Sequence, residues 1–192
     1  MAQSFTAIMP FRAFISVDVD STPKLMEMEE RLRGSGAQLK VVDLDNIHLT
    51  LKFLGDTDEA LIEDIVDIMA RSVKDVKPFT MGLRGTGAFP NPNYMKVIWV
   101  GLEGADALIT ISKTMDRELA NLGFKREKRG FRPHITLARV KGPRKKNILA
   151  QILKDYESEE FGTQKVECVR LKKSVLSREG PTYTTVKEVK FE

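Results

Sequence analysis

Residues 48–51 read His-Leu-Thr-Leu, and residues 134–137 read His-Ile-Thr-Leu. These two segments contain both histidines of the 192-residue chain. Given the first segment, average composition would place threonine and leucine at the same offsets from the second histidine about once in a few hundred trials. The repeated His-x-Thr-Leu pattern therefore indicates that the chain contains two related halves.

The order of the expected elements supports a duplication. Short runs rich in β-branched and aromatic residues alternate with stretches of helical periodicity. The expected elements are a strand at 11–18, a helix at 23–34, strands at 39–42 and 48–54, a helix at 56–76, a strand at 79–85, a loop at 88–93, a strand at 94–101, a helix at 105–122, strands at 124–128 and 134–140, a helix at 145–156, and strands at 164–176 and 182–191. Each half has the order strand, helix, strand, strand, helix, strand, and only the last strand has no counterpart.

The spacing within the two halves agrees with this order. Phe14 precedes His48 by 34 positions, and Val100 precedes His134 by the same number. We predict an α+β fold built from a duplicated strand–helix–strand–strand–helix–strand unit with pseudo-two-fold symmetry. Two antiparallel sheets are expected to face a central cleft, with the helices outside.

The expected domain organisation is a single domain of two lobes at residues 9–192. Its repeat units span about 11–90 and 94–178, followed by the final strand at 182–191. Residues 1–8 are expected to be an extension or tail, because Met9 opens a stretch that would itself make a sensible start.

Composition limits the class of protein and its partners. Hydrophobic residues make up 42% of the chain and charged residues 30%, which is typical of a soluble globular protein rather than a disordered one. The net charge of +4 admits a polyanionic partner without identifying one. Cys168 is the single cysteine and cannot form an intramolecular disulfide. We therefore expect a cytoplasmic monomer, and no apolar run is long enough for a membrane span.

The repeated segments have the residues needed for acid–base catalysis. Residues i and i+2 of a strand share a face, so His48 lies beside Thr50 and His134 beside Thr136. Imidazole has a pKa of about 6.5, so one neutral histidine can accept a proton while a charged one donates a proton. The two threonine hydroxyls can donate hydrogen bonds to phosphate oxygens. This pattern predicts one site with two imidazoles and two hydroxyls.

Basic residues surround the second histidine. Residues 125–146 include ten lysines and arginines and a single acid, Glu127, which favours a polyanion site. Lys52 is expected to share a strand face with His48 and to bind phosphate. Arg139 lies an odd number of positions after His134, so the two side chains point to opposite faces of the strand unless a β-bulge intervenes.

Aromatic residues near the histidines could stack on a nucleobase. The candidates, each of which could equally be a core residue, are Phe14, Phe89, Tyr94 and Phe131. Trp99 lies in an apolar run and is expected to be buried.

Two other interpretations of the histidines remain open. They could be unrelated residues of the core, although the repeated tetrapeptide argues against that. They could also bind a metal, but two histidines fall short of the three protein ligands that a catalytic zinc usually has. We expect neither a metal nor a cofactor.

Several segments together resemble a known family. They are residues 12–15, 48–55, 87–92, 97–101 and 132–139. With them the chain resembles the 2H phosphoesterase superfamily from about Met9 onward. Within that superfamily it is most similar to the RNA 2′,3′-cyclic phosphodiesterases, also called 2′-5′ RNA ligases.

This resemblance implies hydrolysis of an RNA 2′,3′-cyclic phosphate to a 2′-phosphomonoester without a metal. It also implies reversible 2′-5′ joining of RNA ends in some members. The catalytic positions of the family are matched by His48, Thr50, His134 and Thr136, and its phosphate-contacting arginine by Arg139. Residues 1–8 are not part of the family pattern.

Three hypotheses follow for the function. The first is a cyclic phosphodiesterase acting on RNA ends, with His134 as the base and His48 as the acid. The second is 2′-5′ RNA ligation as the main activity of the same site. The third is an RNA-binding module whose histidines contact phosphate without catalysis.

Overall fold

The computed structural model describes residues 10–178 and 180–192, so the expected tail at 1–8 lies outside the described part. Its elements are β1 (Phe11–Asp18), α1 (Pro23–Gly34), β2 (Leu39–Val41), η1 (Leu44–Asn46), β3 (His48–Thr57), η2 (Glu59–Leu61), α2 (Ile62–Val73), β4 (Phe79–Asn91), β5 (Tyr94–Glu103), α3 (Asp106–Leu119), η3 (Ala120–Leu122), β6 (His134–Val140), α4 (Lys146–Asp155), β7 (Glu160–Val166), β8 (Cys168–Leu176) and β9 (Pro181–Lys190). The three η elements are short 3-10 helices.

Local sequence explains where the first helix begins. The Thr22 side chain accepts a hydrogen bond from the backbone N–H of Leu25, and Pro23 occupies the first turn. One side of α1 is apolar and buried, including Leu25, Met28 and Leu32. The helix is therefore defined by its cap and held by packing of one face.

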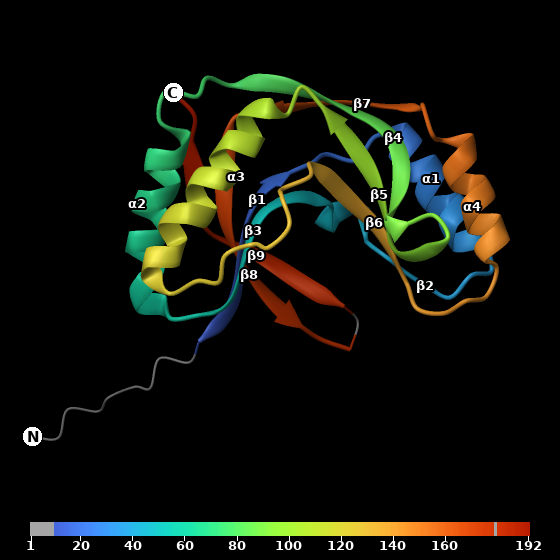
Figure 1. Cartoon of the computed structure of the whole chain (residues 1–192), viewed down its shortest axis with the longest axis horizontal. Coiled ribbons are helices and arrows are strands. Elements are labelled where there is room, and N and C mark those ends of the chain that lie inside the picture. Colours follow the sequence, from blue (N-terminus) through green and yellow to red (C-terminus); the bar gives the residue numbers. More distant parts are fainter. Residues whose placement is uncertain (1–9, 179) are drawn as a thin grey trace, which may run out of the picture.

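The strands form two antiparallel sheets. Sheet A has the order β3-β1-β8-β9, and sheet B has the order β2-β6-β5-β4-β7. Helices α2 and α3 pack on β9 and β3 of sheet A, whereas α1 and α4 pack on β7 and β4 of sheet B (Figure 1). The α+β fold with two antiparallel sheets is therefore confirmed. Each sheet takes strands from both halves of the sequence, so a lobe does not correspond to one proposed repeat unit.

The two histidine strands carry the same irregularity. In the pairing of β3 with β1, Leu51 is skipped, and in the pairing of β6 with β5, Leu137 is skipped. Each skipped residue is the leucine of a His-x-Thr-Leu segment. A bulge of this kind reverses the facing of the residues that follow it, which in β3 are Lys52 and Phe53 before a second register shift at Leu54.

The pairing also corrects the repeat register. Phe14 of β1 lies opposite Phe53, the fifth residue after the first histidine. Val97 of β5 lies opposite Arg139, the fifth residue after the second. Val97, and not Val100, is therefore the counterpart of Phe14, and the equal spacing in the sequence was misleading.

The expected strand at 164–176 is two strands. Residues up to Val166 pair with β4 in sheet B, whereas residues from Cys168 pair with β9, and those from Arg170 also with β1, in sheet A. The chain changes sheet at Glu167, whose carbonyl accepts a hydrogen bond from the backbone N–H of Phe191. Continuous alternation in the sequence gave no sign of this change.

The expected strand at 124–128 is absent. The carbonyl of Lys125 accepts a hydrogen bond from the Lys52 side chain, and the N–H of Glu127 donates to the Asp116 carboxylate. The side chains of Lys52 and Asp116 thus form the backbone hydrogen bonds of this segment that a neighbouring strand would otherwise form.

The expected loop at 88–93 is mostly strand. β4 continues to Asn91, and a two-residue turn leads into β5. The Asn91 side chain accepts hydrogen bonds from the backbone N–H groups of Asn93 and Tyr94. These bonds close the turn tightly enough for both strands to pair to their ends.

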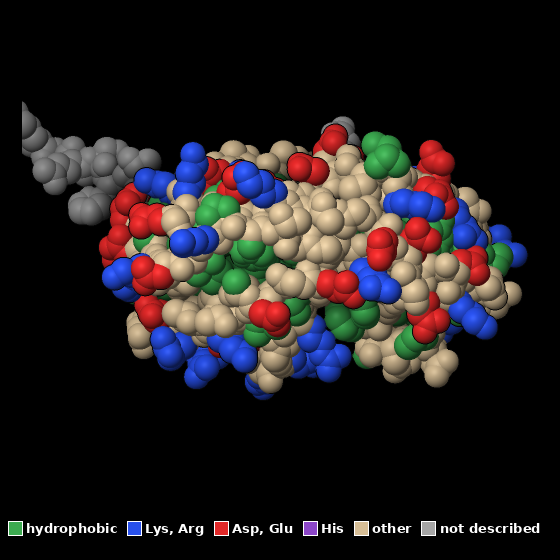
Figure 2. Space-filling view, turned by 90° about the horizontal axis from the view of Figure 1, so that it is seen from above, with side chains coloured by type: hydrophobic (Ala, Val, Ile, Leu, Met, Phe, Trp, Pro, Cys, Tyr) green, Lys and Arg blue, Asp and Glu red, His purple; other side chains and the backbone are tan. Residues whose placement is uncertain are grey.

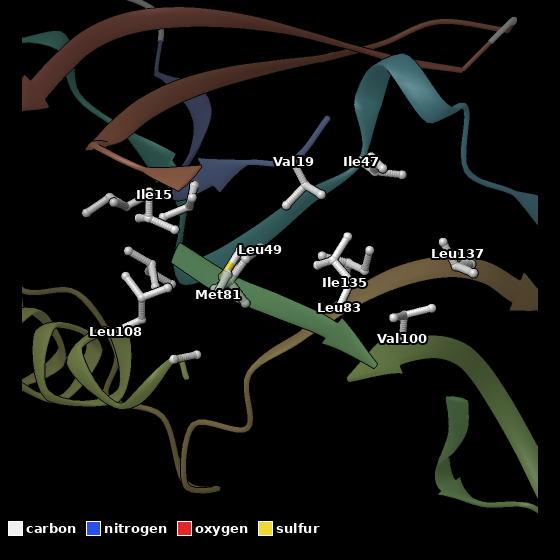
Figure 3. Close-up of a cluster of buried hydrophobic side chains, with 14 of the residues drawn as sticks. Ile15, Val19, Ile47, Leu49, Met81, Leu83, Val100, Leu108, Ile135 and Leu137 are labelled. Atoms are coloured by element: carbon white, nitrogen blue, oxygen red, sulfur yellow. The ribbon is translucent and has the colours of Figure 1, made fainter. Parts of the chain in front are cut away.

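A continuous apolar core joins the two sheets. Figure 3 shows Ile15 and Leu49 of sheet A in one cluster with Met81, Ile135 and Leu137 of sheet B. Leu49 and Ile135 directly follow the two histidines and are fully buried. Since neighbouring residues of a strand face opposite ways, the histidines point away from this core.

Charges of both signs are mixed on the face seen in Figure 2, and no histidine is visible there. Over the described residues, no helix combines the length and apolar character needed to cross a bilayer.

Candidate active site

His48 and His134 are anchored in the same way. The Nδ1 atom of each lies 2.7 Å from the carbonyl oxygen two residues earlier, that of Asn46 or Arg132. A carbonyl can only accept, so each Nδ1 must carry the hydrogen and donate it. Neither Nε2 has a hydrogen-bond partner among the described residues. Each Nε2 is therefore free to accept a proton when the ring is neutral and to donate one when it is charged.

His48 lies among aromatic rings of sheet A. Its ring centroid is 4.9 Å from that of Phe14 and 5.2 Å from that of Tyr183, which lies edge-on. Burial lowers the pKa of His48. The Asn46 carbonyl opposes that effect, the positive charge of Lys172 adds to it, and the carboxylate of Asp18 weakly opposes it.

His134 has a similar setting in sheet B. The Phe89 ring lies 4.9 Å from it, edge-on, and the Trp99 ring lies 6.5 Å from it. Burial lowers the pKa of His134, the Arg132 carbonyl opposes that effect, and the charge of Arg139 adds to it. The Trp99 ring packs against Gly87, where any Cβ would overlap the indole ring.

The two threonines lie beside the histidines, as strand alternation predicts. Thr50 and Thr136 are both partly exposed. In the cross-strand register they lie opposite Ser16 and Trp99. Neither threonine hydroxyl has a hydrogen-bond partner in the described part of the chain, so both are free to bind a ligand.

Arg139 shares a face with His134 because of the β6 bulge. Ala138 is fully buried, whereas Arg139 is exposed and its charge lowers the pKa of His134. Burial raises the pKa of Tyr183, and the same Arg139 charge partly offsets that rise. Arg139 of sheet B is thus near Tyr183 of sheet A, which touches His48. Arg139 thus lies near residues around both histidines, and the strands that carry the histidines, β3 and β6, contact each other.

Lys52 does not lie where strand alternation predicted. The β3 bulge turns its side chain inward, and the residue is 2% exposed. Its ammonium donates hydrogen bonds to Asp116 and to the Lys125 carbonyl, each at 2.6 Å. The expectation that Lys52 shares a face with His48 and binds phosphate is therefore wrong.

A cavity of about 360 Å³ opens beside His48. Its lining includes Asp18, Asn46, Lys172 and Tyr183. Asp18 forms ion pairs with Arg170 and Lys172. Nothing in the sequence singled out Tyr183 or Lys172, because β8 and β9 contain no recognisable motif.

The aromatic candidates have different surroundings. Phe14 and Phe89 contact the two histidines. Tyr94 is exposed, with the ammonium groups of Lys96 and Lys146 over its ring. Phe131 packs against the core. Trp99 was expected to be buried, but it is partly exposed and its ring lies beside His134.

In the described part of the chain, no three histidine, cysteine or acidic side chains converge in a way that could hold a metal ion. Cys168 is half-buried, and burial raises the pKa of its thiol.

Comparison with known proteins supports the resemblance. The family model of the 2'-5' RNA ligase superfamily matches residues 30–174. A protein of Methanothermobacter thermautotrophicus named RNA 2',3'-cyclic phosphodiesterase is 36% identical over 178 residues, covering 92% of this chain and 96% of its own. A protein of the same name from Aeropyrum pernix is 39% identical over 168 residues, covering 87% and 94%.

Solved structures share the fold. TT0787 of Thermus thermophilus has a TM-score of 0.75 at 28% identity, with 94% of this chain and 97% of that chain covered. The structure of E. coli LigT complexed with 3'-AMP has a TM-score of 0.71 at 24% identity, with 95% and 98% covered. By its matching segments, its two-sheet fold and its relatives, this chain belongs to the 2'-5' RNA ligase superfamily.

Proposed function

We propose that this protein hydrolyses RNA 2′,3′-cyclic phosphate ends to 2′-phosphomonoesters, using His48 and His134 as an acid–base pair and no metal. The observation that carries the proposal is the matched anchoring of the two imidazoles. Both donate from Nδ1 to a backbone carbonyl at 2.7 Å and leave Nε2 available. The names of the relatives support the same substrate.

The reaction needs two proton transfers. One imidazole takes a proton from water as the water oxygen bonds to phosphorus. The other gives its Nε2 proton to the 3′ oxygen as the bond between phosphorus and that oxygen breaks. The phosphate stays on the 2′ oxygen, and the two histidines end the turnover with their protonation states exchanged.

We assign the base role to His134, which leaves His48 as the acid. His134 lies near the cation Arg139, which favours its neutral form. At His48 the cation Lys172 lowers the pKa more than the carboxylate of Asp18 raises it, so the acid role of His48 follows from the choice of His134 as the base.

The remaining groups bind the phosphate. Thr50 and Thr136 donate hydrogen bonds to its non-bridging oxygens, and the guanidinium of Arg139 pairs with the same oxygens. Of the ten basic residues at 125–146, only Arg126 forms an ion pair within the described residues. The others are available to attract the RNA backbone.

The test is end analysis of a 2′,3′-cyclic-phosphate oligonucleotide incubated with the protein and a chelator. We expect a 2′-phosphate product, and a fall of about 10²–10⁴-fold in rate for His48→Ala and for His134→Ala. Lys165→Ala, an exposed change on β7, is the matched control and keeps full activity. Full activity in either histidine variant, or loss with chelator, would contradict the proposal.

The same assay separates the other two hypotheses. A 2′-5′ joined product from cyclic-phosphate and 5′-hydroxyl ends would show that the site also runs in reverse. Tight binding of RNA without turnover, kept when both histidines are changed, would identify a binding module instead. We further propose that the protein acts as a monomer in the cytoplasm.

A further inference from the structure

Phe53 is an unusually exposed aromatic residue. It is 60% exposed, although it lies within β3 directly after the buried Lys52. Leaving a large apolar side chain in water forgoes the free energy that burial would supply. The exposed ring of Phe53 is therefore accessible to a ligand.

The bulge at Leu51 decides which way Phe53 points. Without the bulge, Phe53 would share the core face with Leu49. With it, Phe53 lies on the face of sheet A that holds Phe14, which pairs with it and contacts His48. Phe14 is buried but does not belong to the core cluster. Phe53 thus lies on the histidine face of the sheet.

The pseudo-symmetry gives Phe53 a counterpart with a clear chemical character. Phe53 and Arg139 are each the fifth residue after their histidine, and each follows an equivalent bulge. One half of the site thus presents a cation at this position, and the other presents an uncharged aromatic ring. A cation suits the phosphate, whereas an aromatic ring suits the flat face of a base.

We propose that Phe53 is a stacking platform for the nucleobase of the nucleotide whose cyclic phosphate lies between the histidines. The inference rests on the proposed function, since it takes the phosphate position from it. It assigns a nucleobase subsite to the sheet A side of the site.

The distances suit a single nucleotide. The Phe14 ring lies 4.9 Å from the His48 ring and 6.4 Å from the Phe53 ring. The His48 and Phe53 rings therefore cannot be farther apart than these two steps together. A nucleoside cyclic phosphate whose phosphate contacts His48 and whose base contacts Phe53 spans such a distance.

The chemistry of Phe53 predicts a tolerant subsite. A phenyl ring has no hydrogen-bond donor or acceptor, so it cannot read the edge of a base. It can still stack on any base, and a purine offers more area than a pyrimidine. Binding should therefore be stronger for adenosine and guanosine ends than for uridine and cytidine ends.

The test compares Phe53→Ala and Phe53→Trp with the parent protein on three substrates. These are adenosine 2′,3′-cyclic phosphate, uridine 2′,3′-cyclic phosphate and the 2,3-cyclic phosphate of 1-O-methylribose, which lacks a base. In Phe53→Ala we expect KM to rise about 5- to 150-fold on the adenosine substrate. On the baseless substrate both KM and kcat stay within about twofold, and Phe53→Trp keeps the parent KM.

Met26→Ala is the matched control, since it removes another exposed apolar side chain on the outer helix α1 and changes none of these constants. Equal KM increases on the base-containing and baseless substrates would show that Phe53 acts through structure and not through the base. An unchanged KM on the adenosine substrate would also overturn the inference.

A binding measurement keeps this test separate from the proposed function. Trp99 is the single tryptophan and lies beside His134, so its fluorescence reports binding of 2′-AMP and of ribose 2-phosphate. Phe53→Ala should weaken 2′-AMP binding by the same factor and leave ribose 2-phosphate binding unchanged. If the parent protein turns over none of the three substrates but this difference in binding holds, the proposed function fails and the base platform stands.

Discussion

The Lys52 ammonium donates a 2.6 Å hydrogen bond to the Asp116 carboxylate, and this buried pair connects β3 to α3. Asp116 also accepts from the Arg126 side chain and from the Glu127 backbone N–H. Burial alone would raise the pKa of Asp116, but the bonds from Lys52, Glu127 and Arg126 together lower it. The pair therefore fastens the start of the basic segment that leads to His134.

Lys52→Ala should destabilise the protein strongly. Removing one partner of a buried ion pair leaves the other charge without compensation and typically costs about 3–5 kcal/mol. Urea denaturation measures the loss of unfolding free energy. Arg126→Ala removes an exposed partner of the same carboxylate and should cost at most about 1 kcal/mol. A cost for Lys52→Ala no greater than that of Arg126→Ala would contradict this account.

Arg139→Gln should move one limb of the pH–rate profile. Because burial and Arg139 both lower the pKa of His134, removing the cation raises that pKa. A base must be neutral to act, so the acidic limb of kcat/KM should move to higher pH while the alkaline limb stays. Activity should fall at every pH because a phosphate partner is lost. A shift of the alkaline limb instead would assign the acid role to His134.

Lys172→Gln should move the opposite limb. Burial is the main cause of the lowered pKa of His48, and the charge of Lys172 lowers it further. Removing the Lys172 charge therefore raises the pKa of His48. An acid must be protonated to act, so the alkaline limb should move to higher pH and widen the profile. The measurement is kcat/KM against pH at constant ionic strength. An alkaline limb that stays in place would show that His48 is not the acid.

Gly87→Ala should disturb the His134 side of the site. An added Cβ overlaps the Trp99 ring, which must then move away from its place near His134. Overpacking of this kind typically costs about 1–3 kcal/mol, and we expect kcat to fall as well. Gly82→Ala on the same strand is the control, since its Cβ meets only Glu103 at an ordinary 3.7 Å. Equal effects of the two changes, measured by denaturation and kinetics, would refute the role given to Trp99.

The element order and the histidine faces were predictable because they rest on local pattern. Alternation placed Leu49 and Ile135 in the core, and the histidines opposite, up to each bulge. It failed directly after the bulges, where Lys52 turns inward and Arg139 turns to the site. A bulge depends on pairing with a distant strand, so a local pattern does not reveal it.

Long-range pairing also explains the other differences. The change of sheet at Glu167 is set by the partners β4 and β1, and the missing strand at 124–128 by the side chains of Lys52 and Asp116. Tyr183 reaches His48 only because β9 pairs with β8. The resemblance to a family supplied Arg139 where alternation argued against it.

The interleaving of strands between the sheets has a consequence for synthesis on the ribosome. β1 and β3 emerge early, but their sheet stays open at one side until β8 and β9 arrive and pair with it. Until then the nascent chain exposes an unpaired strand edge and lacks Tyr183, so a prematurely terminated product would be both inactive and prone to self-association. A working enzyme can therefore form only after β9 has left the exit tunnel.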